Sequence, residues 1–273
     1  YRQGVPHPIG NVPAAAYGAP PYKVRTSATG SRYTCGSSIS LGNFASAGTL
    51  GCLVRDAAGV MFGLSNNHVS GGCSFAGVGM PVVAPGICDV HPGSIDVLTL
   101  GRHARSLPMV LGWPDVVDIS ANRDAAMFTV RNADSLTSYQ GGFYDTPAEA
   151  IPLAAGIQVE KVGRTTGHTA GTVVTEIFGP VNIMYRAPQY EFSGFVFFEH
   201  MFSVAGTTSV FADEGDSGSL VTTVGADGVR RAVGIVVGVT TDGSSPGGKS
   251  ALILPIVPIL GQLGVSLVSG HNV

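Results

Sequence analysis

The sequence contains few charged residues and a single tryptophan. Asp, Glu, Lys and Arg make up 12% of its 273 residues, about half of the usual quarter. A disordered chain would be rich in charge and poor in apolar residues, whereas 44% of this sequence is hydrophobic, so we expect a folded protein. Fifteen basic and 18 acidic residues give a net charge of −3, and no run of like charge occurs. We therefore expect no nucleic-acid partner, since such partners are bound by clustered Lys and Arg.

Long apolar runs are also missing. The longest ones, Ala232 to Val239 and Ala251 to Leu260, are interrupted by Gly or Pro, and both are far shorter than the roughly 20 residues that cross a bilayer. We therefore expect no membrane span. The chain opens at Tyr1 without a signal-like stretch, which indicates a processed or artificially delimited chain.

The cysteines are few, and their spacing does not suggest a metal site. No Cys-x-x-Cys or paired His pattern accompanies Cys35, Cys52, Cys73 and Cys88, so we expect no metal site. We expect no other cofactor either. Four cysteines allow three pairings. We favour a Cys73–Cys88 disulfide in a Gly- and Pro-rich loop, where closing about 15 residues would add about 3 kcal/mol. Cys52 lies in an apolar run and is expected to be a buried thiol. We expect an extracellular or secreted location rather than a cytoplasmic one.

Glycine and proline are abundant, and they divide the chain into short segments. Residues 1–30 are rich in Pro and predict an extended arm that packs along the rest of the protein or on a second copy, as in a homo-oligomer. From about residue 46, short runs of β-branched and aromatic residues alternate with turns, which is typical of a barrel or sandwich. Two hairpins are expected, one joining Thr49–Arg55 to Val60–Leu64 and one joining Leu220–Val224 to Arg231–Thr240.

Helical patterns are scarce, so the sequence predicts an all-β fold. Only Thr146–Ala155 and Pro255–Leu263 could form short helices, and each contains proline. A region poor in strand-like runs, residues 132–156, could separate two β units. We therefore expect an arm (1–30), a first unit (31–140) and a second unit (141–273).

The sharpest local feature is Asp213-Glu-Gly-Asp-Ser-Gly-Ser-Leu220. It presents Ser217 between glycines just before an apolar strand, which makes Ser217 the candidate nucleophile. Attack on a carbonyl requires a base and N–H groups directed at the oxyanion. Gly215 can adopt backbone angles closed to other residues, so its N–H can point in the same direction as that of Ser217. An ordinary serine in a Gly-rich hairpin is the alternative.

His68 is the candidate base. It follows an apolar run in Leu64-Ser-Asn-Asn-His-Val69, a position from which an imidazole fixed by a sheet could reach a cleft. A capping or surface histidine would fit the same context. Among the other histidines, His168 is expected in a turn, and His103 and His200 could line the cleft.

A third residue should orient the imidazole, and Asp124 is the candidate. It lies at the start of the apolar run Ala125 to Val130, where a carboxylate can be buried while its backbone enters the sheet. Asp118 and Asp96 are competitors, since either could be an ordinary hydrogen-bonded acid at the end of a strand.

His68, Asp124 and Ser217, in that order, resemble the triad of the chymotrypsin-like (trypsin-like) serine peptidases. Five segments stand in the order seen in a bacterial-type branch of that family: Thr49-Leu-Gly-Cys-Leu-Val, Leu64-Ser-Asn-Asn-His-Val, Asp124-Ala-Ala-Met, Lys161-Val-Gly-Arg-Thr-Thr-Gly and Gly215-Asp-Ser-Gly-Ser-Leu. The resemblance implies two perpendicular six-stranded antiparallel β-barrels with the active site in the cleft between them. It also implies a serine endopeptidase that acts on peptides or proteins through an acyl-enzyme, with an oxyanion hole formed by the N–H groups of Gly215 and Ser217. A non-catalytic binding or structural module of the same fold is the alternative.

One departure from the family concerns Asp216. Animal digestive members begin with Ile-Val-Gly-Gly, whose freed amine pairs with the Asp before the serine, and this chain has no such segment. Either another group pairs with Asp216 or the site is ordered without that activation step, and we predict the second.

The family's substrate pocket would lie near Phe211 and Ala212, with Val237 in one wall. These residues are apolar or small, so the sequence predicts preference for an uncharged, apolar or small side chain, although Asp213 or Asp242 could instead receive a basic one.

Gly243-Ser-Ser-Pro-Gly-Gly-Lys-Ser250 matches the phosphate-binding pattern Gly-x-x-x-x-Gly-Lys-Ser. That pattern should open a helix, whereas Pro255 soon follows, so we expect a hairpin loop.

Overall fold

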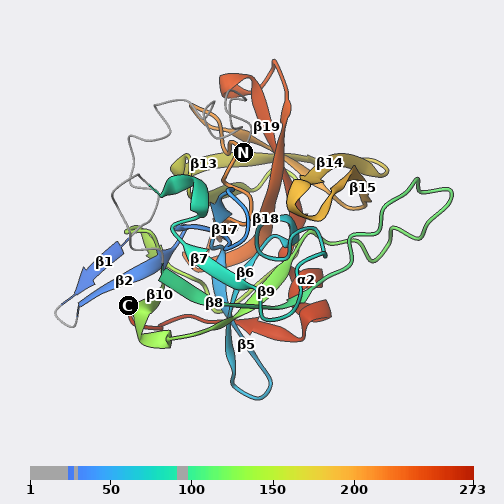
Figure 1. The fold of residues 1–273 in the computed structure, drawn as a ribbon. Coiled ribbons are helices and arrows are strands. Elements are labelled where there is room, and N and C mark those ends of the chain that lie inside the picture. The colour runs from blue at the N-terminus through green and yellow to red at the C-terminus, as the bar shows by residue number, and fades with distance from the viewer. Residues whose placement is uncertain (1–23, 28–29, 91–97) are drawn as a thin grey trace.

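The computed structural model describes residues 24–27, 30–90 and 98–273 (Figure 1). Within these ranges the regular structure is almost entirely β, which confirms the expected all-β class. The only α-helices there are α1 (Asn67–Ser70) and α2 (Ile256–Leu263), and none is long and apolar enough to cross a membrane. Most of the predicted N-terminal arm lies outside the described residues. Single-turn 3₁₀ helices are η3 (Ile87–Asp89), η4 (Ala133–Ser135), η5 (Pro188–Tyr190) and η6 (Pro246–Gly248).

The first unit is built on an eight-stranded sheet, whose strand β20 comes from the C-terminal end of the chain rather than from residues 31–140. In sheet order its strands are β20 (Val265–Leu267), β5 (Cys52–Asp56), β6 (Met61–Ser65), β9 (Ala126–Val130), β8 (Leu98–Ser106), β7 (Pro81–Ala84), β3 (Ser38–Leu41) and β4 (Gly48–Thr49). Only Leu50 and Gly51 separate β4 from β5, which lie near opposite ends of that order. The sheet therefore curls into a half-barrel. The predicted hairpin over residues 49–64 is confirmed by the antiparallel pairing of β5 with β6.

The second unit is a closed antiparallel barrel of six strands. Around the barrel they are β12 (Gln158–Gly163), β13 (Gly167–Glu176), β16 (Phe202–Gly206), β19 (Lys249–Pro255), β18 (Arg230–Thr241) and β17 (Leu220–Val224). The predicted β17–β18 hairpin is confirmed. The segment that resembles a phosphate-binding loop joins β18 to β19 through η6, as expected for a hairpin loop.

Two smaller sheets flank these units. Strands β1 (Val24–Ser27), β2 (Gly30–Cys35), β10 (Leu136–Gln140) and β11 (Tyr144–Asp145) form one of them. The other is the antiparallel hairpin of β14 (Val181–Ala187) and β15 (Phe192–Phe198). In Figure 1 this hairpin lies beside the long connection from β8 to β9, and Leu111 of that connection bridges to Val196 of β15.

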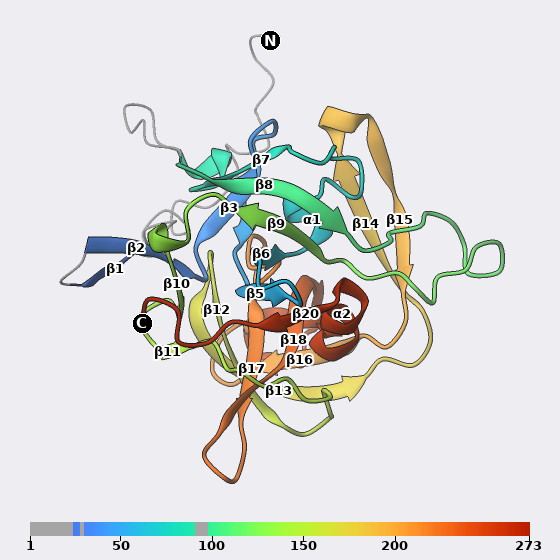
Figure 2. The same cartoon turned by 90° about the horizontal axis from the view of Figure 1, so that it is seen from below.

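The two units share a hydrophobic core in addition to the cluster that each has of its own. This shared core joins residues of the first sheet, such as Val54 and Leu64, to residues of the closed barrel, such as Leu220 and Leu254. The chain end strengthens this junction, because α2 packs beside β18 and β20 then pairs with β5 (Figure 2). Both units are thereby held in fixed positions around the cleft between them.

The predicted short helices had different outcomes. Pro255–Leu263 is confirmed as α2, with Pro255 as its N-cap residue and Gly264 in the left-handed region at its end. The prediction for Thr146–Ala155 is wrong. There the backbone bonds to β18 instead, since Ile151 N donates to Ala232 O and Ala232 N donates to Glu149 O, and Pro147 and Pro152 cannot donate backbone hydrogen bonds in a helix.

The predicted Cys73–Cys88 disulfide is also wrong, because all four cysteines are free thiols. Cys73 is buried in the shared core, whereas Cys88 lies in η3, where its N–H bonds to Ser46 O. Loop spacing made a bridge plausible, but the two residues belong to different packing environments. Cys52 is fully buried, as expected.

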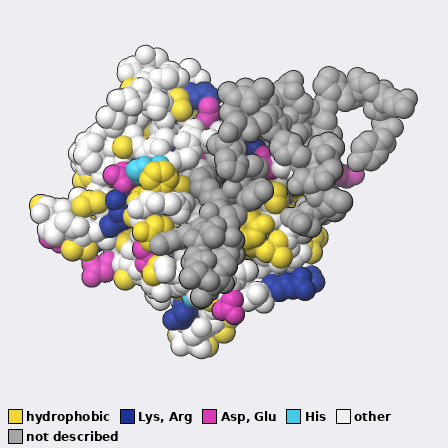
Figure 3. Space-filling view, turned by 90° about the vertical axis from the view of Figure 1, so that its left-hand side faces the viewer, with side chains coloured by type: hydrophobic (Ala, Val, Ile, Leu, Met, Phe, Trp, Pro, Cys, Tyr) yellow, Lys and Arg dark blue, Asp and Glu magenta, His cyan; other side chains and the backbone are white. Residues whose placement is uncertain are grey.

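Charged side chains are sparse on the surface as well as in the sequence. On the face shown in Figure 3, the acidic and basic side chains that are coloured are scattered and form no large patch of one sign.

Candidate active site

His68 is held at the end of β6 by a single helical turn. Strand β6 ends at Ser65, and α1 begins at Asn67, whose side chain anchors the turn. The Asn67 amide donates to Leu107 O at 3.0 Å, and its carbonyl oxygen accepts from Ser74 N at 2.8 Å. The His68 side chain remains 23% exposed, so a fixed backbone presents a ring that solvent can reach.

Asp124 is fully buried and directly contacts His68. Its Oδ2 lies 2.5 Å from His68 Nδ1, and its Oδ1 accepts from His68 N at 3.0 Å. Asn66 fixes the backbone of Asp124 by donating to its carbonyl at 2.6 Å. Of the two competitors, Asp118 is exposed and accepts from Ser120 N, while Asp96 lies outside the described residues.

Ser217 lies in a tight turn before β17, between two glycines with positive φ. Gly215 has φ 93° and Gly218 has φ 95°, and residues other than glycine rarely adopt such backbone angles. A Cβ on Gly218 would lie 2.4 Å from Ser65 Oγ and from Thr49 O. Thr49 of β4 also holds the turn, since its N–H donates to Ser217 O at 2.8 Å and its hydroxyl donates to Gly215 O at 2.9 Å. A strand of the first unit thus positions the serine of the second.

The peptide that precedes Gly215 is oriented by Thr165. The Thr165 hydroxyl donates to Glu214 O at 2.6 Å. In a trans peptide the N–H points opposite to the C=O, so the Gly215 N–H is turned away from Thr165. Within the described ranges, neither this N–H nor that of Ser217 has a protein acceptor. Two backbone donors beside Ser217 are therefore available to a ligand.

The hydroxyl of Ser217 donates to Val237 O at 3.0 Å. Among the described contacts, its Oγ makes no hydrogen bond with the His68 ring. His68 and Asp124 are thus joined directly, whereas Ser217 lines the same cleft as His68 and is bonded to Val237 O instead. Catalytic hydrogen bonds are often long or misaligned before a substrate binds.

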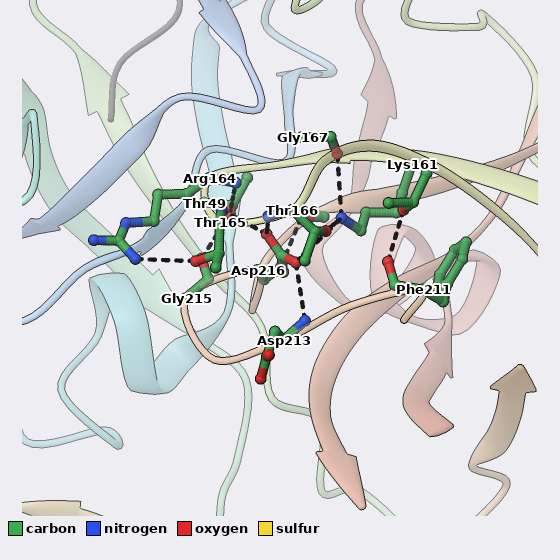
Figure 4. A network of polar contacts seen from close by, with 12 residues as sticks. Thr49, Lys161, Arg164, Thr165, Thr166, Gly167, Phe211, Asp213, Gly215 and Asp216 are labelled. Atoms are coloured by element: carbon green, nitrogen blue, oxygen red, sulfur yellow. Dashed lines mark hydrogen bonds and ion pairs between the residues drawn. The ribbon is translucent and has the colours of Figure 1, made fainter. Parts of the chain in front are cut away.

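Asp216 is surrounded by donors, and the nearest cation is Lys161 of β12 (Figure 4). Lys161 Nζ lies 3.2 Å from Asp216 Oδ2, and both side chains are fully buried. Oδ2 also accepts from Thr166 Oγ1 and Asp213 N, and Oδ1 accepts from Thr165 N. Burial by itself would raise the pKa of Asp216, but Lys161 and these donors hold it below its ordinary value.

Lys161 is therefore the partner of Asp216 that the sequence left open. A lysine side chain, within the described residues, takes the place that the freed amine occupies in the animal digestive members, and order without that activation step stays a prediction. The signal was a lone Lys within a strand-like run, because a cation in an otherwise apolar strand requires a buried counter-charge.

A second buried ion pair lies next to the first. Arg164 contacts both carboxylate oxygens of Asp89, with Nε at 2.9 Å from Oδ2. Asp89 belongs to η3 of the first unit and Arg164 follows β12 of the second, so this bidentate pair links the units beside the serine turn.

The cleft has a volume of about 540 Å³. His68, Gly215, Ser217 and Val237 line it, together with five consecutive residues of β14, Ile183 to Ala187. Phe211 and Ala212, which we expected in the pocket, are only 1% exposed and lie in the core of the closed barrel. Phe211 points inward because its carbonyl is held by Thr169 Oγ1 and its ring lies beneath Lys161 Nζ.

Among the described histidines, His103, His168 and His200 are not part of the cleft lining. His103 is buried on β8, and exposed His200 contacts Glu176 at 2.8 Å. His168 is the second residue of β13 rather than lying in a turn, and it contacts Glu160 at 3.3 Å. Over the described ranges, no group of three or more His, Cys, Asp or Glu side chains could hold a metal ion.

Solved structures with the same architecture define the class of fold. The chain matches Thermobifida fusca Protease A with a TM-score of 0.54 and 22% identity, over 87% of this chain and 98% of that one. It matches a glutamic acid specific serine protease with a TM-score of 0.54 and 20% identity, over 86% of this chain and 100% of that one. The protein therefore has the chymotrypsin-like double-barrel fold, as the resemblance implied.

Sequence comparisons lead to a different group of proteins. A family model described as the Nal1 C-terminal domain matches residues 146–246. Protein NARROW LEAF 1 of Oryza sativa subsp. japonica is 29% identical over 234 residues, which is 78% of this chain. The match covers 38% of that protein, so the chain spans well under half the length of its curated relative.

Proposed function

We propose that the protein is a serine endopeptidase. Ser217 attacks the peptide carbonyl, His68 takes the proton from its hydroxyl and then gives it to the leaving amine, and Asp124 orients the imidazole. The N–H groups of Gly215 and Ser217 bind the oxyanion. Water then hydrolyses the acyl-enzyme with His68 again acting as the base.

One observation carries this proposal. The buried Asp124 carboxylate lies 2.5 Å from His68 Nδ1. The imidazole and Ser217 line one cleft with two N–H groups for which the described part of the chain supplies no acceptor. A structural histidine would not require a buried carboxylate next to a serine and free amides. The serine proteases of the same fold are consistent with this assignment.

The preferred substrate residue is proposed to be apolar or small. The cleft lining includes the aliphatic side chains of Val69, Ile183 and Val237. The two acids that the sequence suggested for a basic side chain already have partners, since Asp213 binds Lys249 Nζ at 2.7 Å and Asp242 accepts from three serine hydroxyls. Neither of them lines the cleft, where Glu214 is accompanied by the cation Arg186. A peptide library cut mainly after Lys or Arg would contradict this preference.

A specific observation favours a non-catalytic role as the second candidate. The Ser217 hydroxyl donates to Val237 O rather than to His68, so catalysis requires this bond to break. If it persists, the cleft could bind a peptide without cleaving it.

A fluorophosphonate probe separates the two candidates, because it reacts only with an activated serine. We expect one adduct per chain, mapped to Ser217 by mass spectrometry, and none on S217A. The control is S135A, which removes an exposed hydroxyl that donates to the nearby Asn132 O. If the native chain is not labelled, or S217A is labelled equally, the protein is not a serine peptidase.

A further inference from the structure

Asp124 has a second side-chain partner that does not come from either barrel. The hydroxyl of Tyr185 donates to Asp124 Oδ2 at 3.0 Å. The same carboxylate oxygen contacts His68 Nδ1. Tyr185 lies on β14 of the separate β14–β15 hairpin, and its ring centroid lies 5.4 Å from that of His68.

The direction of this side chain is set by the strand. Along β14 the residues alternate between exposed and more buried positions, and Tyr185 and Ala187 are buried. Tyr185 packs edge-on to Phe198 of β15, with 6.1 Å between ring centroids. The hairpin is also held to the β8–β9 connection, since Asn122 Nδ2 donates to Phe197 O at 3.0 Å. The tyrosine is thus fixed in place.

A buried carboxylate needs such a donor. Asp124 is fully buried, and each unfilled hydrogen-bonding position on a buried charge is costly. Among the described residues, only His68 and Tyr185 donate to its carboxylate oxygens. The Tyr185 hydroxyl stays protonated, because burial and the adjacent Asp124 raise its pKa well above the ordinary value.

We infer that Tyr185 is a positioning residue of the active site, which holds the Asp124 carboxylate in the ionised, oriented form that His68 requires. The inference rests on the proposed function, but it concerns a residue that neither the triad nor the oxyanion hole includes. It also makes the β14–β15 hairpin part of the catalytic apparatus, because residues on both sides of Tyr185 line the cleft.

The expected pH effect has a definite sign. The Tyr185 hydrogen bond is stronger when the His68–Asp124 pair carries a net negative charge than when His68 is protonated. The hydroxyl therefore favours the deprotonated pair, and its removal should raise the apparent pKa of the pair. Three other titratable groups lie nearby. The Cys73 thiol lies near Asp124 and stays protonated, because burial raises its pKa. Glu214 and Arg186 belong to the cleft lining.

The test is Y185F, which removes the hydroxyl and retains the ring. Fluorophosphonate labelling of Ser217 is followed across pH in the full chain, together with the NMR titration of the His68 ring. We expect the acidic limb of the labelling rate plotted against pH to move up by about one pH unit, since a hydrogen bond to a charge contributes about one such unit. At pH values below this limb, Y185F should be labelled about tenfold more slowly than the wild type.

Y190F is the matched control. Tyr190 lies between β14 and β15, and its hydroxyl accepts from Asn43 rather than contacting Asp124. We expect Y190F to keep both the labelling rate and the midpoint of the wild type. If Y185F does not fold, 3,5-difluorotyrosine at position 185, a stronger donor, should move the limb to lower pH.

The outcomes distinguish the two proposals. If the wild type is labelled, and Y185F is labelled at the same rate with the same pH midpoint, the role of Tyr185 is overturned and the peptidase proposal stands. If the wild type is not labelled, the peptidase proposal is overturned. The NMR titration still tests Tyr185 in that case, because it needs no catalysis. An unshifted His68 midpoint in Y185F overturns the inference, and an upward shift supports it.

Discussion

At the scale of single residues, the serine turn depends on side chains that the chain brings in from elsewhere. Thr49 of the first unit and Thr165 of the second both bond to backbone carbonyls of this turn. Lys161 and Thr166 bond to the carboxylate of Asp216 within it. The orientation of the Gly215 and Ser217 amides is thus a consequence of buried polar contacts, each of which would be costly to leave unpaired.

The buried Lys161–Asp216 pair gives a stability prediction. K161M leaves Asp216 buried without its cation, which should lower the free energy of unfolding by about 3–5 kcal/mol at neutral pH. Urea denaturation measures this loss. The control K249M removes a half-exposed partner of Asp213, and we expect it to cost less than about 1 kcal/mol.

The same pair predicts a pH dependence. The pKa of Asp216 in the folded protein lies below the ordinary value of 3.8, so its stabilising contribution is present above about pH 4 and is lost as the pH falls through the folded-state pKa. Without Lys161 the pKa of Asp216 should rise. The difference in unfolding free energy between wild type and K161M should therefore narrow on acidification, and a constant difference from pH 7 to pH 3 would contradict this account.

At the scale of elements, α2 is a short helix whose two glycines have opposite roles. Gly264 ends the helix at φ 66° in the left-handed region, where a Cβ is strained. Gly261 lies within the helix, and a Cβ built on it would meet nothing within 4 Å.

These glycines form a matched pair of substitutions. G264A should destabilise the protein by about 1 kcal/mol, whereas G261A should stabilise it by roughly 0.5–1 kcal/mol, because alanine restricts the unfolded chain without a clash. Thermal unfolding of both variants checks the signs. If the melting temperatures of G264A and G261A shift equally in the same direction, the end of α2 does not have this geometry.

At the scale of the whole molecule, the protein is held together by packing and buried polar contacts rather than by cross-links. The four cysteines are free, and the shared core continues from the half-barrel through the closed barrel to α2. Burial raises the pKa of Cys35 and Cys73 to about 12 and that of Cys88 to about 11, so their thiolates are scarce near neutral pH.

Reductant should therefore leave the melting temperature unchanged. Alkylation in denaturant without reductant should add four labels per chain by mass, and in the folded protein Cys88 should react first, because the other three thiols are buried. Two or fewer labels would establish a disulfide and contradict the structure.

Local sequence determined the hairpins, α2 and the serine turn, because alternating apolar residues, Pro255 and the glycines beside Ser217 act over a few neighbours. It also singled out His68 and Asp124, whose contact in the structure joins residues 56 positions apart. Only the tertiary structure decided which groups surround them. Lys161, Thr49 and Tyr185 reach the site through strand pairing and a hairpin, and Cys73 and Cys88 were kept apart by packing. Such long-range contacts depend on how whole elements pack, which no local pattern specifies.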